Sequence, residues 1–218
     1  MPAWSHSALN GYETCPRRHY LLRVAKVVKE PESEALRWGN YVHKALENRL
    51  KAGTPLPDTL TTYESICSRF EGTGEVTAER EAVLTSKFKP TGWWSKDAWL
   101  RSKWDVAIRH RPGVMSIWDW KTGKRKPDSD QMRLSAAVGF LVEPTVQVIT
   151  TGFVWLKDNA IDKEVFHRPK AKEIWAEFLP RVKRFEIAHE QNKWPARPSG
   201  LCRRHCPVGR ANCEHCGT

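Results

Sequence analysis

Hydrophobic residues recur at helical spacing in several parts of the chain. Between residues 33 and 51 they form one stripe of an amphipathic helix, made of Trp38, Val42, Ala45 and Leu46. Further helices are predicted over residues 5–15, 58–70, 128–143 and 170–191. Asp128 or Ser129 is the predicted cap of the helix that begins there, and Pro180 predicts a kink in the last helix.

The middle of the chain changes to patterns typical of strands. Three β-leaning runs, separated by the turn-rich pieces KPTGWW and RPG, predict an antiparallel meander: VTAEREAVLTSKF, AWLRSKWDVAIRH and VMSIWDWKT. Farther on, VQVITTGFVWL has the composition of a buried strand, and DKEVFHR is predicted to pair with it. The order of helices and strands predicts an α/β fold, a mixed β-sheet flanked by helices in one compact domain.

The net positive charge of the chain indicates which class of partner it binds. The chain has 36 Lys and Arg against 25 Asp and Glu, a formal net charge of +11 and a pI near 9.5. Such a surplus favours a polyanion such as nucleic acid, although solubility alone also accounts for a basic protein. No apolar run approaches the roughly 18 residues of a spanning helix, and the N-terminus lacks the apolar core of a secretion signal. We therefore expect a cytoplasmic protein without membrane contact.

The strand WDWKTGK carries the first candidate chemistry. Successive side chains of a strand point to opposite faces, so Asp119 and Lys121 share one side and the flanking tryptophans the other. Asp105 lies in the preceding β-leaning run, where an antiparallel neighbour can bring its carboxylate close to Asp119. Two carboxylates beside an ammonium group outline a magnesium site for phosphodiester hydrolysis. A simple ion pair between Asp119 and Lys121 at a strand end is the alternative.

Two other polar residues have a candidate role. His43 lies on or beside the apolar stripe of its helix, where it is either an ordinary helix residue or an imidazole ligand of the metal. Gln131 begins the helix that follows the WDWKTGK strand, where it contacts DNA or Lys121 or simply adds polarity to a helix N-terminus.

Taken together, these motifs resemble one known family. The RecB-like branch of the PD-(D/E)XK nucleases shows similar segments in the same order, and it includes the iron–sulfur exonucleases of CRISPR adaptation, the AddB nuclease domain and phage relatives. The segments are WSHSALNGYETCPRRHYLL, GNYVHKALE, KWDVAI, WDWKTGK, DSDQMRLSAA and a cysteine-rich C-terminus. The resemblance extends from Ser5 to about His215.

The resemblance implies a fold and an activity. It predicts a single nuclease domain with a restriction-endonuclease-like core at about residues 73–168, a helical part at about 1–72, and a C-terminal helix and cysteine cluster at about 169–218. It implies a DNA nuclease that requires Mg²⁺ or Mn²⁺. Such an enzyme is expected to be an exonuclease acting on DNA ends or single strands in replication, recombination or repair, in this case phage-encoded.

The resemblance also assigns roles to residues. It implies that the metal ligands are His43, Asp105, Asp119 and the carbonyl of Trp120. Lys121 is then the catalytic lysine, and Gln131 is the glutamine of the family's Q-x-x-x-Y helix. Two positions depart from the family pattern, because Ser135 replaces the tyrosine of that helix and Ser102 replaces a glycine before the first aspartate. Loss of the tyrosine favours the rival view of a non-catalytic DNA-binding or adaptor protein on a nuclease fold.

Cysteines gather at the C-terminus. Their clustering in an unsecreted chain indicates metal ligation more than disulfides. One alternative is a zinc site formed by Cys202, Cys206, Cys213 and Cys216, as in a zinc-stabilised endonuclease. The other, implied by the family, is a [4Fe-4S] cluster held by Cys15, Cys202, Cys206 and Cys213, with Cys216 as a spare or alternative ligand. Either would act as a structural staple between the N- and C-terminal segments.

Basic and aromatic residues suggest where DNA binds. The candidates for phosphate contact are Arg17, Arg18, Lys124, Arg125 and Lys126. Trp93 and Trp94 are expected either to stack on unpaired bases or to cover a hydrophobic edge. With these residues we expect a nuclease that binds single strands or duplex ends.

Overall fold

The computed structural model describes residues 3–30, 32–126 and 128–217 of the chain. These residues divide into two compact units. We call residues 34–176 the sheet unit, and the described residues before 34 and after 176 the cysteine unit. Helix α6 (Ala171–Gln191) begins in the first and continues in the second.

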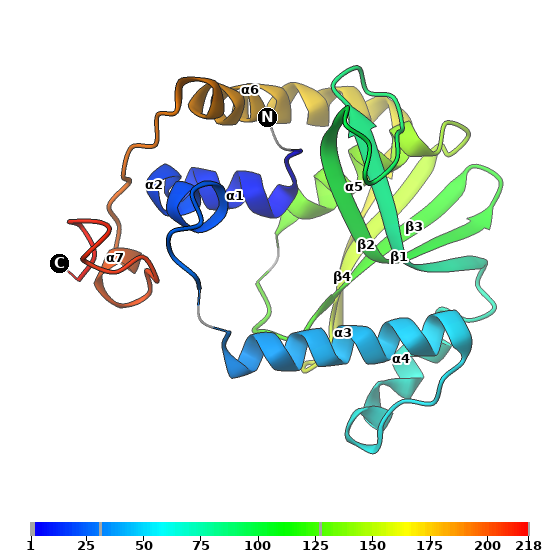
Figure 1. Ribbon diagram of the computed structural model, residues 1–218. Helices are drawn as coiled ribbons and strands as arrows, with labels where there is room; N and C mark the ends of the chain where they lie inside the picture. Colours follow the sequence, from blue (N-terminus) through cyan, green and yellow to red (C-terminus); the bar gives the residue numbers. More distant parts are fainter. Residues whose placement is uncertain (1–2, 31, 127, 218) are drawn as a thin grey trace. The chain divides into compact units, whose positions relative to one another are not determined.

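The sheet unit is built on five strands in the order β1-β2-β3-β4-β5 (Figure 1). All neighbours are antiparallel except β3 and β4, which are parallel and are connected through helix α5. This arrangement confirms the predicted α/β fold with a mixed sheet. The strands are β1 (Glu75–Thr85), β2 (Ala98–Arg111), β3 (Val114–Lys121), β4 (Val148–Trp155) and β5 (Ala160–His167).

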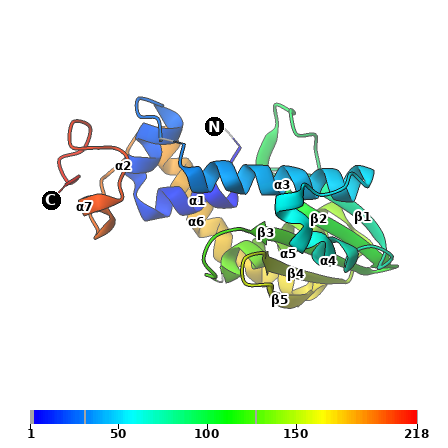
Figure 2. The same ribbon diagram turned by 90° about the horizontal axis from the view of Figure 1, so that it is seen from below.

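Helices α3 (Glu34–Ala52) and α4 (Glu64–Ser68) lie on the same side of the strands (Figures 1 and 2). Val42 and Leu46 of α3 are fully buried against Val106 and other residues of the sheet. The predicted stripe is wrong at Trp38, which is 42% exposed because the buried contacts of α3 begin only at Val42. The helix predicted over 58–70 forms as a 3₁₀-helix, Asp58–Tyr63, followed by α4.

Helix α5 (Ser129–Val142) begins at the predicted cap, since Asp128 Oδ1 accepts the backbone N–H of Gln131 at 3.2 Å. Its middle lies very close to the strands. A Cβ added to Gly139 would lie 2.7 Å from Cδ1 of Ile149 and 3.1 Å from Cδ1 of Ile117. This close packing fixes the position of α5, and therefore of Gln131 in its first turn.

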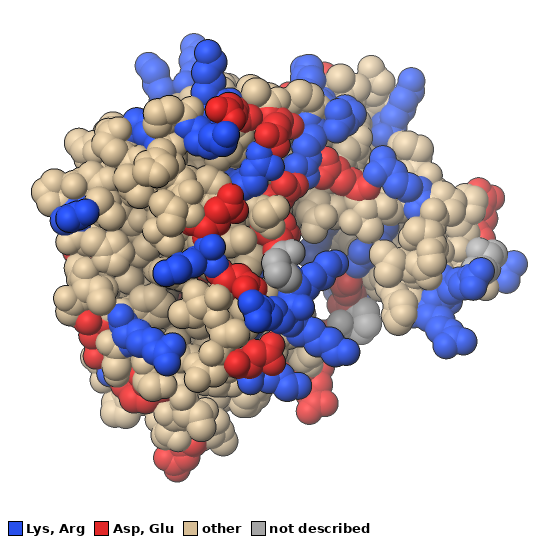
Figure 3. Space-filling model, turned by 180° about the vertical axis from the view of Figure 1, so that it is seen from behind, with Lys and Arg blue, Asp and Glu red and all other residues tan. Residues whose placement is uncertain are grey.

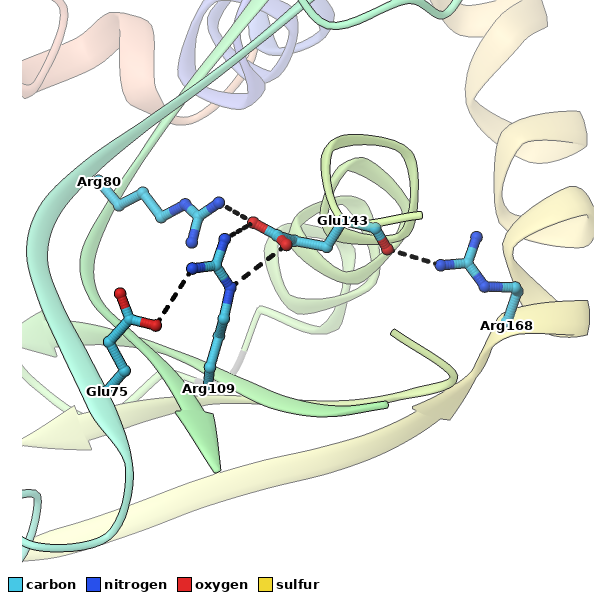
Figure 4. Close-up of polar contacts among 5 residues, drawn as sticks. All are labelled: Glu75, Arg80, Arg109, Glu143 and Arg168. Atoms are coloured by element: carbon cyan, nitrogen blue, oxygen red, sulfur yellow. Dashed lines mark hydrogen bonds and ion pairs between the residues drawn. The ribbon is translucent and has the colours of Figure 1, made fainter. Parts of the chain in front are cut away.

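The other end of α5 is held by charged residues (Figure 4). Arg80 of β1 and Arg109 of β2 both donate to the buried carboxylate of Glu143, which follows the helix. Arg109 also pairs with Glu75. Arg168 donates to the carbonyl oxygen of Glu143 at 2.7 Å, and it thereby satisfies a backbone group that the end of a helix leaves unpaired.

The cysteine unit is mostly helical. Its elements are α1 (His6–Thr14), α2 (Pro16–His19), a π-helical turn (Tyr20–Val24), residues 177–191 of α6 and the short helix α7 (Leu201–Arg204). Ser5 caps α1 by accepting the N–H of Ala8 at 3.2 Å. Arg181 of α6 binds the carboxylate of Glu13 through two nitrogens at 2.8 and 2.7 Å, which ties α6 to α1.

Aromatic rings form the packed centre of the cysteine unit. The buried side chain of His19 lies among Tyr12, Phe185, His189 and Trp194, with ring centroids 5.3–6.3 Å away. Burial, with the charges of His189 and Arg23, lowers the pKa of His19 to about 4. His19 is therefore a neutral, apolar-like member of this centre at neutral pH.

Charge is distributed over the surface in both signs. On the face drawn in Figure 3, Lys and Arg side chains are interspersed with Asp and Glu, and they do not form one uninterrupted basic patch. Within the described part of the chain, no helix combines the length and the apolar character needed to cross a bilayer.

Candidate active site

His43 of α3 and Asp105 of β2 meet in the sheet unit. Nδ1 of His43 lies 3.2 Å from Oδ1 of Asp105. The other oxygen of the same carboxylate, Oδ2, accepts the backbone N–H of Trp120 at 2.7 Å. Asp105 is thus oriented from two sides, by a helix and by the neighbouring strand β3.

Asp119, Lys121 and Gln131 form a closed polar triangle next to that pair. Nζ of Lys121 lies 2.5 Å from Oδ2 of Asp119 and donates to Oε1 of Gln131 at 3.1 Å. The amide nitrogen of Gln131 donates to Oδ1 of Asp119 at 3.0 Å. The ammonium group also lies 4.6 Å from the ring centroid of Phe153. The predicted D-x-K pair is therefore fixed by α5 and β4 as well as by its own strand.

The electrostatics of the site reflect crowded negative charge. Burial, and then the nearby carboxylate of Asp105, raise the pKa of Asp119 above its usual range. Burial alone would lower the pKa of His43, but its hydrogen bond with Asp105 and the charges of Asp105, Asp119 and Glu79 give a net increase. Carboxylates that repel one another in a partly buried place favour binding of a cation.

One acidic residue of the site escaped the sequence analysis. Glu79 of β1 offers a carboxylate oxygen that lies, with a nitrogen of His43 and an oxygen of Asp105, in a group whose atoms are all within 4.8 Å of one another. An open pocket of about 500 Å³ is lined by these three residues together with others of α3. The strand register, in which Ala78 pairs with Val106, places Glu79 beside Asp105. The sequence alone does not determine this register.

The donor atoms suit a hard divalent cation. One imidazole and several carboxylate oxygens match the ligands of Mg²⁺ or Mn²⁺, and the open pocket leaves room for water and a phosphate. The residues present therefore fit the predicted metal. Asp119 lies next to this group, held by Lys121 and Gln131.

The cysteine unit brings five thiols to one pocket. Cys15 lines it together with the four C-terminal cysteines, Cys202, Cys206, Cys213 and Cys216. The Sγ atoms of Cys15 and Cys202 accept backbone N–H groups at 3.4 and 3.5 Å. Burial, and then the neighbouring Cys206 and Cys213, raise the pKa of Cys216 to about 12. A donor set of closely spaced thiols fits zinc or an iron–sulfur cluster.

The sixth cysteine lies elsewhere. Cys67 is fully buried in the hydrophobic core of the sheet unit, next to α3 and α4 residues. Burial raises the pKa of its thiol to about 11. It has the environment of a small apolar residue.

The predicted DNA-binding residues lie in three places. Lys124 and Lys126 are exposed after β3, whereas Arg125 forms an ion pair with Asp162. In the β1–β2 loop, Trp94 is 87% exposed, and the guanidinium of Arg101 lies 5.6 Å from the ring of Trp93 and 6.0 Å from that of Trp94. In the cysteine unit, Arg17 and Arg18, which are predicted to contact phosphate, line the cysteine pocket.

The chain is similar to known proteins at the level of family and fold. No curated protein sequence matches the chain. A crystal structure from Eubacterium rectale, named "Putative exonuclease", superimposes with a TM-score of 0.53 at 14% identity, covering 93% of this chain and 86% of its own. The protein SSO0001 gives a TM-score of 0.44 at 14% identity, covering 95% of this chain and 84% of its own. The model of the PD-(D/E)XK nuclease superfamily matches residues 3–214. Because that match spans nearly the whole sequence, the chain belongs to the PD-(D/E)XK nuclease superfamily.

Proposed function

We propose that the chain is a DNA exonuclease that depends on Mg²⁺ or Mn²⁺ and belongs to the RecB-like branch of its superfamily. The observation that carries the proposal is the meeting of His43, Asp105, Asp119 and Lys121 in the sheet unit. Side chains from a helix and two strands converge there on one small region. The similarity to a protein named as an exonuclease supports the exonuclease activity.

Each residue has a defined part in this proposal. His43, Asp105, Asp119 and the carbonyl of Trp120 hold the cation, which when bound polarises the phosphate and makes water a better nucleophile. Lys121 orients the attacking water and stabilises negative charge that develops on the phosphate oxygens. Gln131 holds both Lys121 and Asp119 through its amide group. It thereby sets the direction of the ammonium group.

DNA is the proposed substrate, as unpaired strands or duplex ends. The net charge of +11 favours a polyanion. Lys124 and Lys126, which follow the catalytic strand, are exposed for phosphate contact. The exposed ring of Trp94, with Arg101 beside it, offers a stacking surface for a base. Processing of DNA ends in replication, recombination or repair is the matching biological role.

For the cysteine pocket, we propose a [4Fe-4S] cluster on Cys15, Cys202, Cys206 and Cys213. The position of Cys15 in the same pocket supports this ligand set, because a zinc site made of the four C-terminal cysteines gives Cys15 no role. Metal analysis and visible absorbance of anaerobically purified protein distinguish the two. Cys15→Ala should lose the cluster, whereas retention of one zinc per chain in that variant would support zinc.

The nuclease proposal is tested on DNA labelled at either end, in Mg²⁺, in Mn²⁺ and with a chelator. We expect the parent protein to shorten linear DNA only with metal and to leave covalently closed circles intact. Asp119→Asn should abolish digestion, whereas Asp58→Asn, at an exposed position of the same unit, should not. Cleavage of circles would contradict the exonuclease, and full activity of Asp119→Asn would contradict the site.

A further inference from the structure

The side chain of Glu79 lies in the candidate metal site, but Glu79 belongs to none of the sequence motifs described above. Its carboxylate belongs to the compact group with His43 and Asp105, and only 15% of the side chain is exposed. From these contacts we propose that Glu79 is an additional ligand of the divalent cation, and that Lys103 neutralises it when no cation is bound. The inference rests on the metal-dependent activity proposed above.

The backbone at Glu79 is unusual for a strand. Its φ of +55° is left-handed, a conformation that costs a residue with a side chain about 1–2 kcal/mol. Within β1, Ala78 pairs with Val106 and Arg80 pairs with Trp104, so Glu79 and Asp105 lie between two regular pairs. Strain of this kind persists where the surrounding structure uses it, and it concentrates at functional sites.

The left-handed residue changes the faces of β1. In a regular strand, residues four apart point to the same face. Val76 packs with the cluster that contains α3 residues, whereas Arg80 reaches Glu143 at the end of α5. Because the strand turns over between them, the carboxylate of Glu79 is directed toward Asp105 and His43.

Strand β2 shows the same change at the facing position. Val106 belongs to the cluster with α3, yet Trp104, two residues earlier, lies 3.8 Å from a Cβ built on Gly139 of α5. Both strands therefore change faces at the level of Glu79 and Asp105. The two carboxylates meet because two distortions coincide.

An ion pair with Lys103 does not by itself explain this geometry. Nζ of Lys103 pairs with the carboxylate of Glu79, and the hydrogen bond to Glu79 raises the pKa of that lysine. Glu81, however, lies directly opposite Lys103 in the strand register and has ordinary strand conformation. A partner for Lys103 was therefore available without a left-handed residue. What Glu81 lacks is proximity to His43 and Asp105.

Lys103 can act as a replaceable counterion. Its side chain is 47% exposed, so its ammonium group can move into water when a divalent cation takes its place. Without a cation, the same ammonium group offsets the repulsion between Glu79 and Asp105. Neutral substitutions at these two positions should therefore have opposite effects: loss of the Glu79 charge should weaken metal binding, and loss of the Lys103 charge should strengthen it.

The test measures binding of Mn²⁺ to the full chain without DNA, by titration calorimetry and by electron paramagnetic resonance. Glu79→Gln should weaken binding by about tenfold or more, which corresponds to about 1.4 kcal/mol. Lys103→Met should strengthen it by roughly threefold, because a competing cation is removed. Glu81→Gln, which removes the same charge two residues farther along β1, should bind like the parent.

Two results separate this inference from the proposed function. If the parent binds Mn²⁺ and Asp105→Asn does not, but Glu79→Gln binds as tightly as the parent, the role of Glu79 is wrong and the metal site stands. If the parent itself does not bind Mn²⁺, both are contradicted. Urea unfolding in the absence of metal should give Glu79→Gln a stability equal to or above that of the parent, which excludes loss of the fold as the cause of weaker binding.

Discussion

The two candidate sites differ in what holds their side chains in place. In the sheet unit, Asp119, Lys121 and Gln131 bond to one another, and each lies on or next to a regular element. In the cysteine unit, the C-terminal cysteines lie in a segment with one four-residue helix, α7. The buried cluster there consists of Leu21, Val208 and Cys216, and Cys206 and Cys213 pack against it.

For the two proposed metal sites, this difference predicts which one needs its metal for folding. The acidic site takes its shape from sheet hydrogen bonds and from the close packing of α5, so it is formed before a cation binds. The cysteine pocket has only a small apolar cluster beside its five thiols, so under the proposed ligation the metal would supply the stability that packing does not. Loss of metal should therefore have opposite structural consequences in the two units.

The largest expected effect follows from removing a thiol. Cys206→Ser should lose the bound metal and expose residues 195–217 to proteolysis and hydrogen exchange, because metal binding and folding of such a segment are coupled. The strands of the sheet unit should keep their exchange protection. Cys67→Ala removes a thiol from the core of the sheet unit and should retain the metal. Equal protection of residues 195–217 in Cys206→Ser and the parent would remove the distinction between the two sites.

Loss of the catalytic lysine in the sheet unit should stop the reaction without unfolding the site. Lys121→Ala should reduce DNA digestion by about 10²–10³-fold, the usual cost of losing a charged group that stabilises a transition state. The thermal midpoint should change little, because Asp119 keeps its bond to Gln131. Lys163→Ala, which removes an exposed lysine of β5 in the same unit, is the matched control and should remain active. Single-turnover rates with saturating enzyme provide the measurement.

Local features of this fold were readable from the sequence. The alternation of WDWKTGK places Asp119 and Lys121 on one side, and the structure shows them 2.5 Å apart. Asp128 and Ser129 are the two predicted caps of α5, and the structure shows that Asp128 is the one. The mixed sheet follows from the order of helical and strand-like patterns. Each of these depends on neighbours within a few residues, or on element order.

Features that depend on distant contacts were not readable. Glu79 joins the site through strand register and a left-handed backbone, and neither leaves a signal in a run of alternating residues. Trp38 fits the apolar stripe of α3 by spacing, but only the position of the core decides that it is exposed. Cysteine spacing likewise leaves several ligand sets open, and the chain path is what brings Cys15 to the others.

A pH effect should distinguish the cysteine unit from the sheet unit. The pKa of His19 is about 4 in the folded protein and near 6.5 when unfolded, so the unfolded chain takes up the proton first as the pH falls. The contribution of neutral His19 is complete above about pH 6.5 and decreases toward pH 4, by up to about 3 kcal/mol. Urea unfolding across this pH range, monitored by hydrogen exchange in α1, measures how steeply the free energy of unfolding changes with pH.

Substitution of His19 provides the control for this slope. His19→Gln should flatten the dependence, because glutamine does not take up a proton. His167→Gln, at an exposed position of β5, should leave it unchanged. An identical slope in the parent and in His19→Gln would mean that other groups determine the acid sensitivity of the cysteine unit.

The smallest expected effect comes from a substitution that removes the hydrogen bonds between side chains of the acidic site. Gln131→Ala removes both bonds that the amide makes, so the turnover rate should decrease by about tenfold while the KM for DNA stays near that of the parent. Gln147→Ala, an exposed glutamine outside the site, should have no effect.

Gln131→Glu separates the two halves of that amide. It keeps an oxygen for Lys121, loses the N–H donated to Asp119, and adds a carboxylate that raises the pKa of Asp119 further. Its pH–rate profile should therefore move to higher pH, whereas that of Gln131→Ala should shift less. If both variants keep the parental profile and rate, the triangle of Asp119, Lys121 and Gln131 is a consequence of packing, and the acidic site depends on its cation for order as much as the cysteine pocket does.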